Sequence, residues 1–347
     1  MVFAPLPRAD LVHGHVESSF STETGAWSDL KFVEDPFLRV HGLAPALNYG
    51  QQAFEGMKAF RFPDGSIAIF RTKDHAERFN RSSSVVSIPQ IPTSHFIRAV
   101  HLAVARNGEF VPPHGKKGAL MYIRPVIFGS SAGLSLNPAK EYTFCVYTQP
   151  INAYHGLNPL DALILEDYDR CAPRGTGAAK IGGNYAPIMR WTESGKKSGF
   201  QTILHLDSKT NSYIEEFSSS GFLGVQSDRG KPETLKIVVP DSTNFVPSIT
   251  SDSCIAYDEM PSFREVLAVG TAATIVAIRS ITSLSRQQRF TYVEEDQHKE
   301  SSVTNHYAAN KLTDTLWRIQ QGLEDDVFGW CDKVQEPNSD ASIFSGP

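Results

Sequence analysis

A lysine set inside a glycine-rich run can act as an amine nucleophile, and one such lysine lies near the middle of this chain. Residues 174–187 read Arg-Gly-Thr-Gly-Ala-Ala-Lys-Ile-Gly-Gly-Asn-Tyr-Ala-Pro, with Lys180 at the centre. Glycine lets the main chain approach a ligand closely, so the four glycines from Gly175 to Gly183 predict a tight wall beside a bound molecule. Lys180 could work there as an amine or contact a phosphate, and a surface turn with a solvated lysine would look the same.

The spacing of this run excludes two nucleotide-binding motifs. A P-loop places four residues between its glycines and follows the second with Lys and Ser or Thr, and that pattern is absent. The dinucleotide-binding fingerprint fails as well, because its third glycine would fall at Lys180. We expect Lys180 to be the catalytic residue of this glycine-rich run.

The composition predicts a globular protein that binds small molecules. The chain has 347 residues, 41% of them hydrophobic and 20% charged, which suits two domains at about 100 to 200 residues each. A net charge of -5 provides no basic surface for nucleic acid. The four cysteines lie far apart in the sequence, which predicts neither a metal site nor a disulfide framework and favours a reducing compartment.

No segment of the chain predicts a membrane association. No apolar run approaches the roughly 18 residues that a spanning helix needs. The first ten residues lack a basic stretch followed by an apolar one, and they contain an early acid, so we expect neither a signal peptide nor a transit peptide. The expected location is cytoplasmic.

The first half of the chain alternates arms, strands and helices. Residues 1–27 show no sustained period and predict a surface arm, whereas residues 58–70 predict a β-hairpin. A helix is expected from about Thr72, and it carries Arg78. A second helix should begin near Thr93 or Ser94.

Residues 120–128 alternate apolar and polar positions and are rich in β-branched side chains, which predicts a half-buried strand. Tyr122 and Arg124 then point the same way. A guanidinium beside a phenol on one sheet face suits a carboxylate, although a purely structural pair would have the same sequence.

A turn-rich segment, residues 151–160, predicts the connection between two domains. The first would span residues 1–150 and the second residues 161–335, with a flexible tail over 336–347. Strands and helices alternate without regular βαβ spacing, so we predict an α+β fold with mixed sheets.

Two helices of the second half are predicted from their apolar spacing. One should run from about 184 to 195 with Met189 toward the core, and a final one over about 303–322 with Tyr307 among its core residues.

Several blocks, taken in order, resemble the fold type IV aminotransferases that use pyridoxal 5'-phosphate, and most closely the branched-chain amino acid aminotransferases. The similarity runs from about residue 30 to 320. It implies a two-domain protein, with a small α/β domain and a larger domain built on a mixed β-barrel-like sheet with helices, that forms a homodimer. The blocks that carry it are Phe54-Glu-Gly-Met-Lys-Ala-Phe-Arg, Arg78, Tyr122-Ile-Arg124-Pro, Lys180-Ile-Gly-Gly-Asn-Tyr185-Ala, Glu215-Glu216 and Gly270-Thr-Ala-Ala.

The resemblance implies roles toward the cofactor. Lys180 would form a Schiff base with the cofactor aldehyde and move the proton at the substrate Cα. Glu216 would face the pyridine nitrogen, and its neighbour Glu215 would point to the opposite side of the strand. Tyr185 would bond the 3' oxygen. The phosphate would be bound by Arg78, Ile249, Thr250 and Thr271, and no metal is implied.

The same resemblance implies a substrate site. Tyr122 and the backbone amides of Thr271 and Ala272 would bind the α-carboxylate, and Arg124 would support Tyr122 and receive the second carboxylate of glutamate. The candidates for an apolar wall are Phe54, Tyr49 and Tyr154.

The expected activity is transfer of the amino group of an L-branched-chain amino acid to 2-oxoglutarate. One departure bears on substrate preference: the family usually has a small-residue loop and an asparagine after its glutamate, whereas residues 217–221 here read Phe-Ser-Ser-Ser-Gly. A D-amino acid or amine transaminase, an aminodeoxychorismate lyase and a catalytically silent scaffold are the alternatives.

Overall fold

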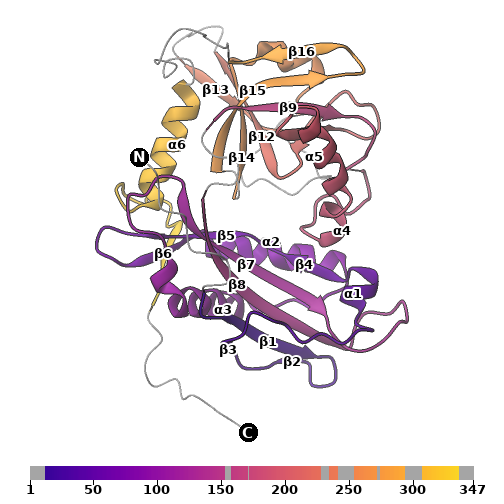
Figure 1. Ribbon diagram of the computed structural model, residues 1–347, viewed down its shortest axis with the longest axis vertical. Helices are drawn as coiled ribbons and strands as arrows, with labels where there is room; N and C mark the ends of the chain where they lie inside the picture. The colour runs from indigo at the N-terminus through magenta and orange to yellow at the C-terminus, as the bar shows by residue number, and fades with distance from the viewer. Residues whose placement is uncertain are drawn as a thin grey trace. The chain divides into compact units, whose positions relative to one another are not determined.

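Two compact units make up the chain (Figure 1). The computed structural model describes residues 12–152, 158–170, 172–227, 234–240, 254–271, 274–293 and 307–335. The first unit comprises residues 1–152 and 318–347, and the second comprises residues 153–317. Residues 318–335, which the domain prediction placed in the second half, thus group with the first unit.

The first unit is built on a nine-stranded sheet. Its order is β17-β6-β5-β7-β8-β1-β2, with β3 beside β1 and β4 beside β7. The strands are β1 (His15–Ser21), β2 (Ala26–Trp27), β3 (Lys31–Val33), β4 (Gln52–Phe54), β5 (Met57–Arg61), β6 (Ile67–Phe70), β7 (Ala119–Gly129), β8 (Glu141–Asn152) and β17 (Cys331–Lys333).

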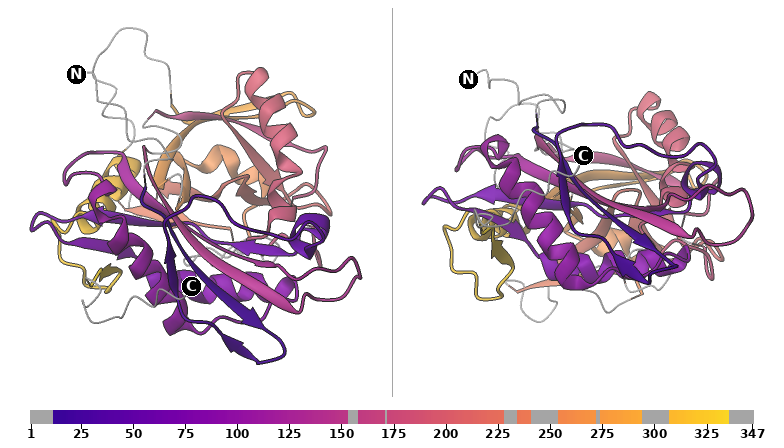
Figure 2. Two further views of the ribbon diagram at one scale, coloured as in Figure 1. Left: turned by 60° about the horizontal axis from the view of Figure 1, so that its bottom comes forward. Right: turned by 90° about the horizontal axis from the view of Figure 1, so that it is seen from below.

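Two helices, α2 (Thr72–Val85) and α3 (Thr93–Arg106), pack on the same face of this sheet, as Figure 2 shows from two sides, and a short α1 (Pro45–Tyr49) precedes β4. Phe79 of α2 and Phe96 of α3 both contact Phe144 of β8, with ring centroids 5.6 and 5.8 Å away. The buried residues of α2 recur at helical spacing, so that His75 and Phe79 lie on the face toward the sheet.

The longest strand pair positions the predicted Tyr-x-Arg pair. β7 pairs with β8 from Ala119 to Gly129, and Tyr122 lies opposite Gln149 while Arg124 lies opposite Tyr147. Ile123, between them, is fully buried. Alternation along β7 therefore puts Ile123 in the core and its two polar neighbours on the other face, as the sequence predicts.

The second unit contains a closed barrel. Six strands pair in the ring β11-β10-β9-β15-β14-β12, which a further pairing of β12 with β11 closes, and β13 and β16 extend it. β9 runs parallel to both of its neighbours, whereas the other pairs are antiparallel, so the predicted mixed, barrel-like sheet is confirmed. The strands are β9 (Leu160–Leu165), β10 (Thr202–Leu206), β11 (Ile214–Phe217), β12 (Ser220–Ser227), β13 (Leu235–Val238), β14 (Glu265–Gly270), β15 (Thr274–Ser283) and β16 (Gln288–Thr291).

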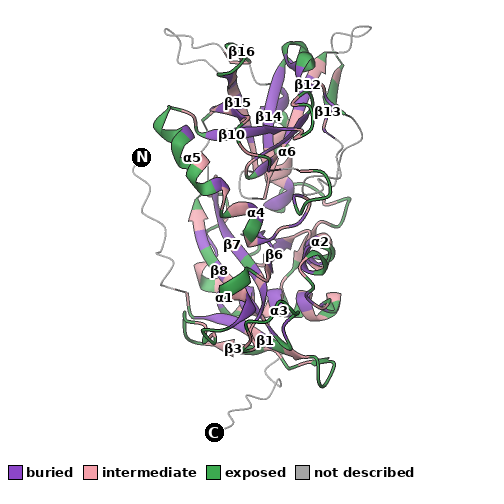
Figure 3. Cartoon of the chain, turned by 90° about the vertical axis from the view of Figure 1, so that its right-hand side faces the viewer, coloured by how far each residue is buried: buried purple, intermediate pink, exposed green. Residues whose placement is uncertain are grey.

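Aromatic side chains fill the barrel. Phe222 lies between Phe217 and Phe263, with ring centroids 5.8 Å away on each side. Figure 3 shows the buried stretches of the strands in purple. At the start of α6 (Tyr307–Gln320), the backbone amides of Ala308 and Ala309 donate to the buried Glu265 carboxylate at 3.0 and 2.9 Å, which satisfies first-turn N–H groups that no helical carbonyl can reach.

Three helix predictions need correction. The helix expected over 184–195 is two, α4 (Gly182–Tyr185) and α5 (Ile188–Lys197), because Pro187 lacks the N–H that would continue the first. Met189 is 68% exposed and Tyr307 is 58% exposed, so neither belongs to the core. Among the described residues, no helix has the length and apolar character to cross a lipid bilayer.

Candidate active site

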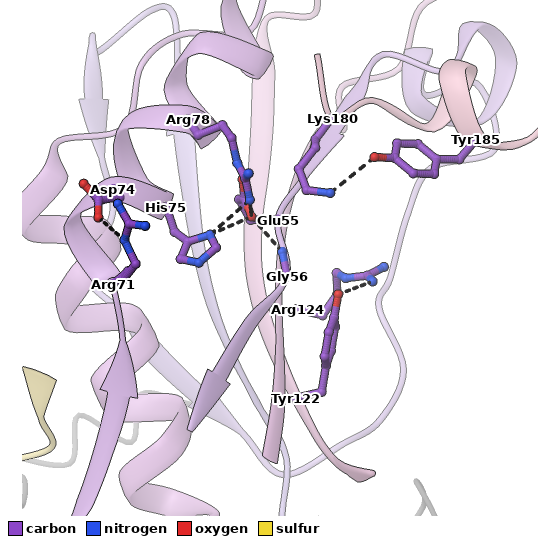
Figure 4. Close-up of polar contacts among 10 residues, drawn as sticks. All are labelled: Glu55, Gly56, Arg71, Asp74, His75, Arg78, Tyr122, Arg124, Lys180 and Tyr185. Atoms are coloured by element: carbon purple, nitrogen blue, oxygen red, sulfur yellow. Dashed lines mark hydrogen bonds and ion pairs between the residues drawn. The ribbon is translucent and has the colours of Figure 1, made fainter. Parts of the chain in front are cut away.

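The lysine of the glycine-rich run lies half-buried just before α4. Its Nζ is 3.2 Å from the Tyr185 hydroxyl and 5.4 Å from the centre of that ring. Figure 4 shows the amine pointing at the hydroxyl. One helical turn separates the two residues, so the short helix after the glycines is what brings them together.

Asn184, for which the sequence pattern predicts no role, holds the loop that carries Lys180. This side chain is 8% exposed and donates to the carbonyls of Thr176 at 2.5 Å and Ala179 at 2.8 Å. Its Oδ1 accepts from the Thr176 hydroxyl at 2.7 Å. A run rich in glycine would otherwise sample many backbone conformations, and these three bonds restrain it.

Glu216 lies on β11 with only 5% of its surface exposed, and it forms an ion pair with Arg170. The Arg170 Nη2 is 2.8 Å from Oε1 of the carboxylate. Glu215 is also buried, so both faces of β11 are covered.

Arg170 connects the other groups of the second unit. It is 5% exposed, Nη1 donates to the carbonyl of Gly177 at 3.3 Å, and Cζ lies 5.3 Å from the centre of the Tyr185 ring. A second buried group, His205, lies on β10. Its burial and, to a lesser extent, the positive charge of Arg170 lower the pKa of His205 to about 3. His205 is therefore neutral at physiological pH, and Arg170 keeps its positive charge for Glu216.

In the first unit, Arg124 and Tyr122 contact each other directly. Arg124 Nη2 donates to the Tyr122 hydroxyl at 3.1 Å. The guanidinium carbon lies 4.9 Å from the centre of the Phe54 ring and 5.3 Å from that of Tyr122. This pair borders a pocket of about 310 Å³ within the unit, whose lining residues are Val12, Gly14, Pro36, Tyr122, Arg124, Tyr147, Thr148 and Gln149.

Arg78, predicted to bind a phosphate, is held by a carboxylate in the first unit. Its Nε and Nη2 donate to Glu55 at 2.5 and 2.9 Å, and His75 Nδ1 is 2.9 Å from the same carboxylate. Burial alone would raise the pKa of Glu55, but Arg78 and His75 reverse the effect and hold that pKa well below its usual range. Glu55 is thus a charged group at the centre of a cluster that no spacing in the sequence predicts.

The remaining predicted residues are placed as follows. Tyr49 is 49% exposed, and its hydroxyl donates to the carbonyl of Leu134 at 2.5 Å. Thr271 is half-buried directly after β14. The predicted Ile249, Thr250, Ala272 and Tyr154 lie outside the described residues. The roles assigned to all these residues stay predictions.

Comparison with known proteins gives the family. The family model described as amino-transferase class IV matches residues 52–281. Aminotransferase atnJ of Emericella nidulans is 49% identical over 350 residues, which cover 96% of this chain and 98% of that protein. Transaminase AMT5 of Alternaria alternata is 46% identical over 363 residues, covering 99% of this chain and 93% of that protein.

Solved structures give the same fold. The branched-chain amino acid aminotransferase of Escherichia coli superposes with a TM-score of 0.69 at 23% identity, over 88% of this chain and 97% of that chain. The branched-chain amino acid aminotransferase of Thermobaculum terrenum, in its PLP-form, has a TM-score of 0.66 at 19% identity, over 86% of this chain and 94% of that chain. The predicted fold type IV architecture is confirmed, and the chain belongs to the amino-transferase class IV family.

Proposed function

We propose that this aminotransferase moves the amino group of an L-branched-chain or similarly apolar amino acid to 2-oxoglutarate, which yields the 2-oxo acid and L-glutamate. The observation that supports this substrate pair is the Arg124 guanidinium, whose carbon lies 4.9 and 5.3 Å from the ring centres of Phe54 and Tyr122, beside the pocket of the first unit. The aminotransferase chemistry itself follows from the family.

Class IV amino-transferases use pyridoxal 5'-phosphate, and the residues of the second unit fit that group. When bound, the cofactor supplies an aldehyde carbon for an amine and a ring that withdraws electrons from the substrate Cα. The chain offers a half-buried amine at Lys180, a phenol at Tyr185 and a buried carboxylate at Glu216. An amine, a hydroxyl and a carboxylate are the groups needed for the aldehyde, the ring oxygen and the ring nitrogen.

Lys180 is the residue that we assign to proton movement. A primary amine can bond an aldehyde carbon and, once released, can take a proton from the substrate Cα and return it. The Tyr185 hydroxyl at 3.2 Å orients that amine through a hydrogen bond. Asn184 keeps the loop in place, so the amine does not have to be ordered anew in each cycle.

Glu216 would hold a proton on the ring nitrogen. For this the carboxylate must stay charged although it is 5% exposed, and an isolated buried carboxylate would take up a proton instead. The ion pair with Arg170 at 2.8 Å favours the charged form.

An aminotransferase of this kind must accept an apolar side chain and an acidic one in turn. A guanidinium can meet both demands, because its flat face is weakly hydrated while its edge donates hydrogen bonds to a carboxylate in a fork. Arg124 is exposed, and its guanidinium carbon lies 4.9 Å from the centre of the Phe54 ring and 5.3 Å from that of Tyr122, so apolar surface and hydrogen-bond donors are offered at one place. We assign it the second carboxylate of 2-oxoglutarate and glutamate.

The test is a substrate panel on the purified enzyme. L-leucine, L-isoleucine and L-valine, their D-forms and simple primary amines are each incubated with 2-oxoglutarate, and L-glutamate is measured. Glutamate should form only with the L-amino acids, and a Lys180→Ala variant should form none. Turnover of the D-forms or the amines instead would refute the proposed substrate class.

An Arg124→Met variant tests the assignment of the acceptor site within the same panel. Because a charge-assisted hydrogen bond contributes about 1.5–3 kcal/mol, KM for 2-oxoglutarate should rise roughly tenfold to a hundredfold. KM for a 2-oxo acid with an apolar side chain should change much less. Equal increases in KM for both acceptors would mean that Arg124 does not bind the second carboxylate.

A further inference from the structure

Glu55 is a buried carboxylate to which the proposed reaction assigns no role, although its partner Arg78 is predicted to bind the cofactor phosphate. It lies between β4 and β5 with 0% of its surface exposed. Burying a carboxylate is costly unless charged partners surround it. Its partners come from α2, and Figure 4 shows them pointing inward to one carboxylate.

The pairing with Arg78 fixes the plane of the guanidinium. Nε donates to one carboxylate oxygen at 2.5 Å and Nη2 donates to the other at 2.9 Å. Two parallel bonds between planar groups define an orientation, which a single contact does not. His75, one turn earlier on α2, lies 2.9 Å from Oε2 and braces the carboxylate from the same helix face.

Glu55 is also tied to the sheet. Its backbone N–H donates to the carbonyl of Pro125 on β7 at 2.9 Å. The side-chain Oε2 accepts from the backbone N–H of Gly56 at 2.9 Å. The position of Arg78 is therefore set by contacts to β7, the strand that carries Tyr122 and Arg124.

We propose that Glu55 is a positioning residue for phosphate recognition, holding the Arg78 guanidinium by one edge so that it is oriented for the cofactor phosphate. The inference rests on the proposed function and on the phosphate-binding role that the family resemblance predicts for Arg78. Two effects oppose each other, because an oriented guanidinium binds an anion more tightly while a nearby carboxylate repels it. The two short bonds and the complete burial of Glu55 favour orientation, since a long arginine side chain otherwise loses about 2 kcal/mol of rotamer entropy when it is ordered.

The experiment compares the affinities of the full-length apo-protein for pyridoxal 5'-phosphate and for pyridoxal, which lacks the phosphate. The dissociation constant for pyridoxal divided by that for pyridoxal 5'-phosphate isolates the phosphate contribution, and a general structural defect would weaken the binding of both ligands alike. Glu55→Gln should lower this ratio about tenfold, the effect of losing one well-placed charged hydrogen bond. The control is Asp74→Asn, which removes a carboxylate from the Arg71–Asp74 ion pair of the same helix and should leave the ratio unchanged.

A double-mutant cycle with Arg78→Gln separates this inference from the proposed function. If Glu55 acts through Arg78, the double variant should show the same ratio as Arg78→Gln alone. If Arg78→Gln leaves the wild-type ratio, Arg78 does not bind the phosphate and the inference about Glu55 falls, whereas the proposed function stands or falls by the substrate panel. If Arg78→Gln lowers the ratio but Glu55→Gln leaves or raises it, only the role of Glu55 is wrong. Should Glu55→Gln fail to fold, Glu55→Asp keeps the charge, is one methylene too short for both bonds, and should lower the ratio in the same way.

Discussion

Arg170 is a single buried residue that connects separate segments of the proposed site. Arg170 bonds Glu216 on β11 and the Gly177 carbonyl in the glycine-rich loop, and it lies over the ring of Tyr185. One buried guanidinium thus ties the carboxylate proposed for the ring nitrogen to the loop that carries Lys180. A five-donor side chain with planar geometry is suited to such a junction.

Gly56 is a second residue whose identity matters, because no side chain fits there. A Cβ at this position would lie 1.9 Å from the Tyr122 hydroxyl oxygen, far inside contact distance. We predict that Gly56→Ala displaces the Tyr122 ring, breaks its hydrogen bond with Arg124 and raises KM for the amino acid about tenfold. Steady-state kinetics with L-leucine measures this.

The matched control is Gly42→Ala, because a Cβ there meets no atom within 4 Å. Its KM should equal that of the wild type. A wild-type KM in Gly56→Ala would contradict the predicted contact between Tyr122 and the substrate carboxylate.

At the scale of elements, the regular segments were predictable and their packing was not. Helices from Thr72 and Thr93 and the alternating strand β7 follow from local spacing, which a sequence displays directly. The prediction that Met189 belongs to the core is wrong, because helical spacing does not show which face of α5 another element covers.

The ion pairs of the site could not be predicted from the sequence. Arg170 with Glu216 and Arg78 with Glu55 are pairs whose members lie far apart in the sequence. No helical or strand period relates them, so only the folded sheet shows which carboxylate meets which guanidinium. The family resemblance predicted one member of each pair, Glu216 and Arg78, and left their partners unassigned.

The barrel strand β10 carries a group that should make the protein sensitive to acid. His205 has a pKa of about 3 in the folded protein, because burial and then Arg170 disfavour its charged form, against an ordinary value of 6.5. Between these values the unfolded chain binds a proton that the folded chain does not, so the free energy of unfolding falls as the pH drops below 6.5. At pH 5 the loss should be about 2 kcal/mol.

A His205→Gln variant should lose this part of the pH dependence. Glutamine does not titrate, and it can still bond the Ser218 hydroxyl that His205 Nε2 contacts at 2.9 Å. Urea unfolding at pH 7 and pH 5 measures the difference, with the exposed His41→Gln as control. An identical loss of stability in wild type and His205→Gln would contradict the assignment.

At the scale of the whole molecule, an exposed apolar patch is the clearest feature of the first unit. The Gly133 amide donates to the carbonyl of Leu43 at 3.1 Å, and the Tyr49 hydroxyl donates to the carbonyl of Leu134 at 2.5 Å, so α1 lies beside the segment 133–136. The large side chains exposed on this patch are Leu43, Leu47, Tyr49, Leu134 and Leu136, the last with 88% of its surface accessible.

An apolar surface of this kind commonly marks a protein interface. The homodimer implied by the family resemblance gives it an occupant, and we predict that a second copy of the chain covers it. Light scattering should then give twice the chain mass of 38.3 kDa. Leu47→Glu with Leu136→Glu should shift the mass to that of one chain, because each buried glutamate would have to leave water without a partner. Leu284→Glu, at a 64% exposed leucine of the second unit, should stay dimeric. A monomeric wild type would refute the dimer, and a dimer that survives both patch substitutions would place the interface elsewhere.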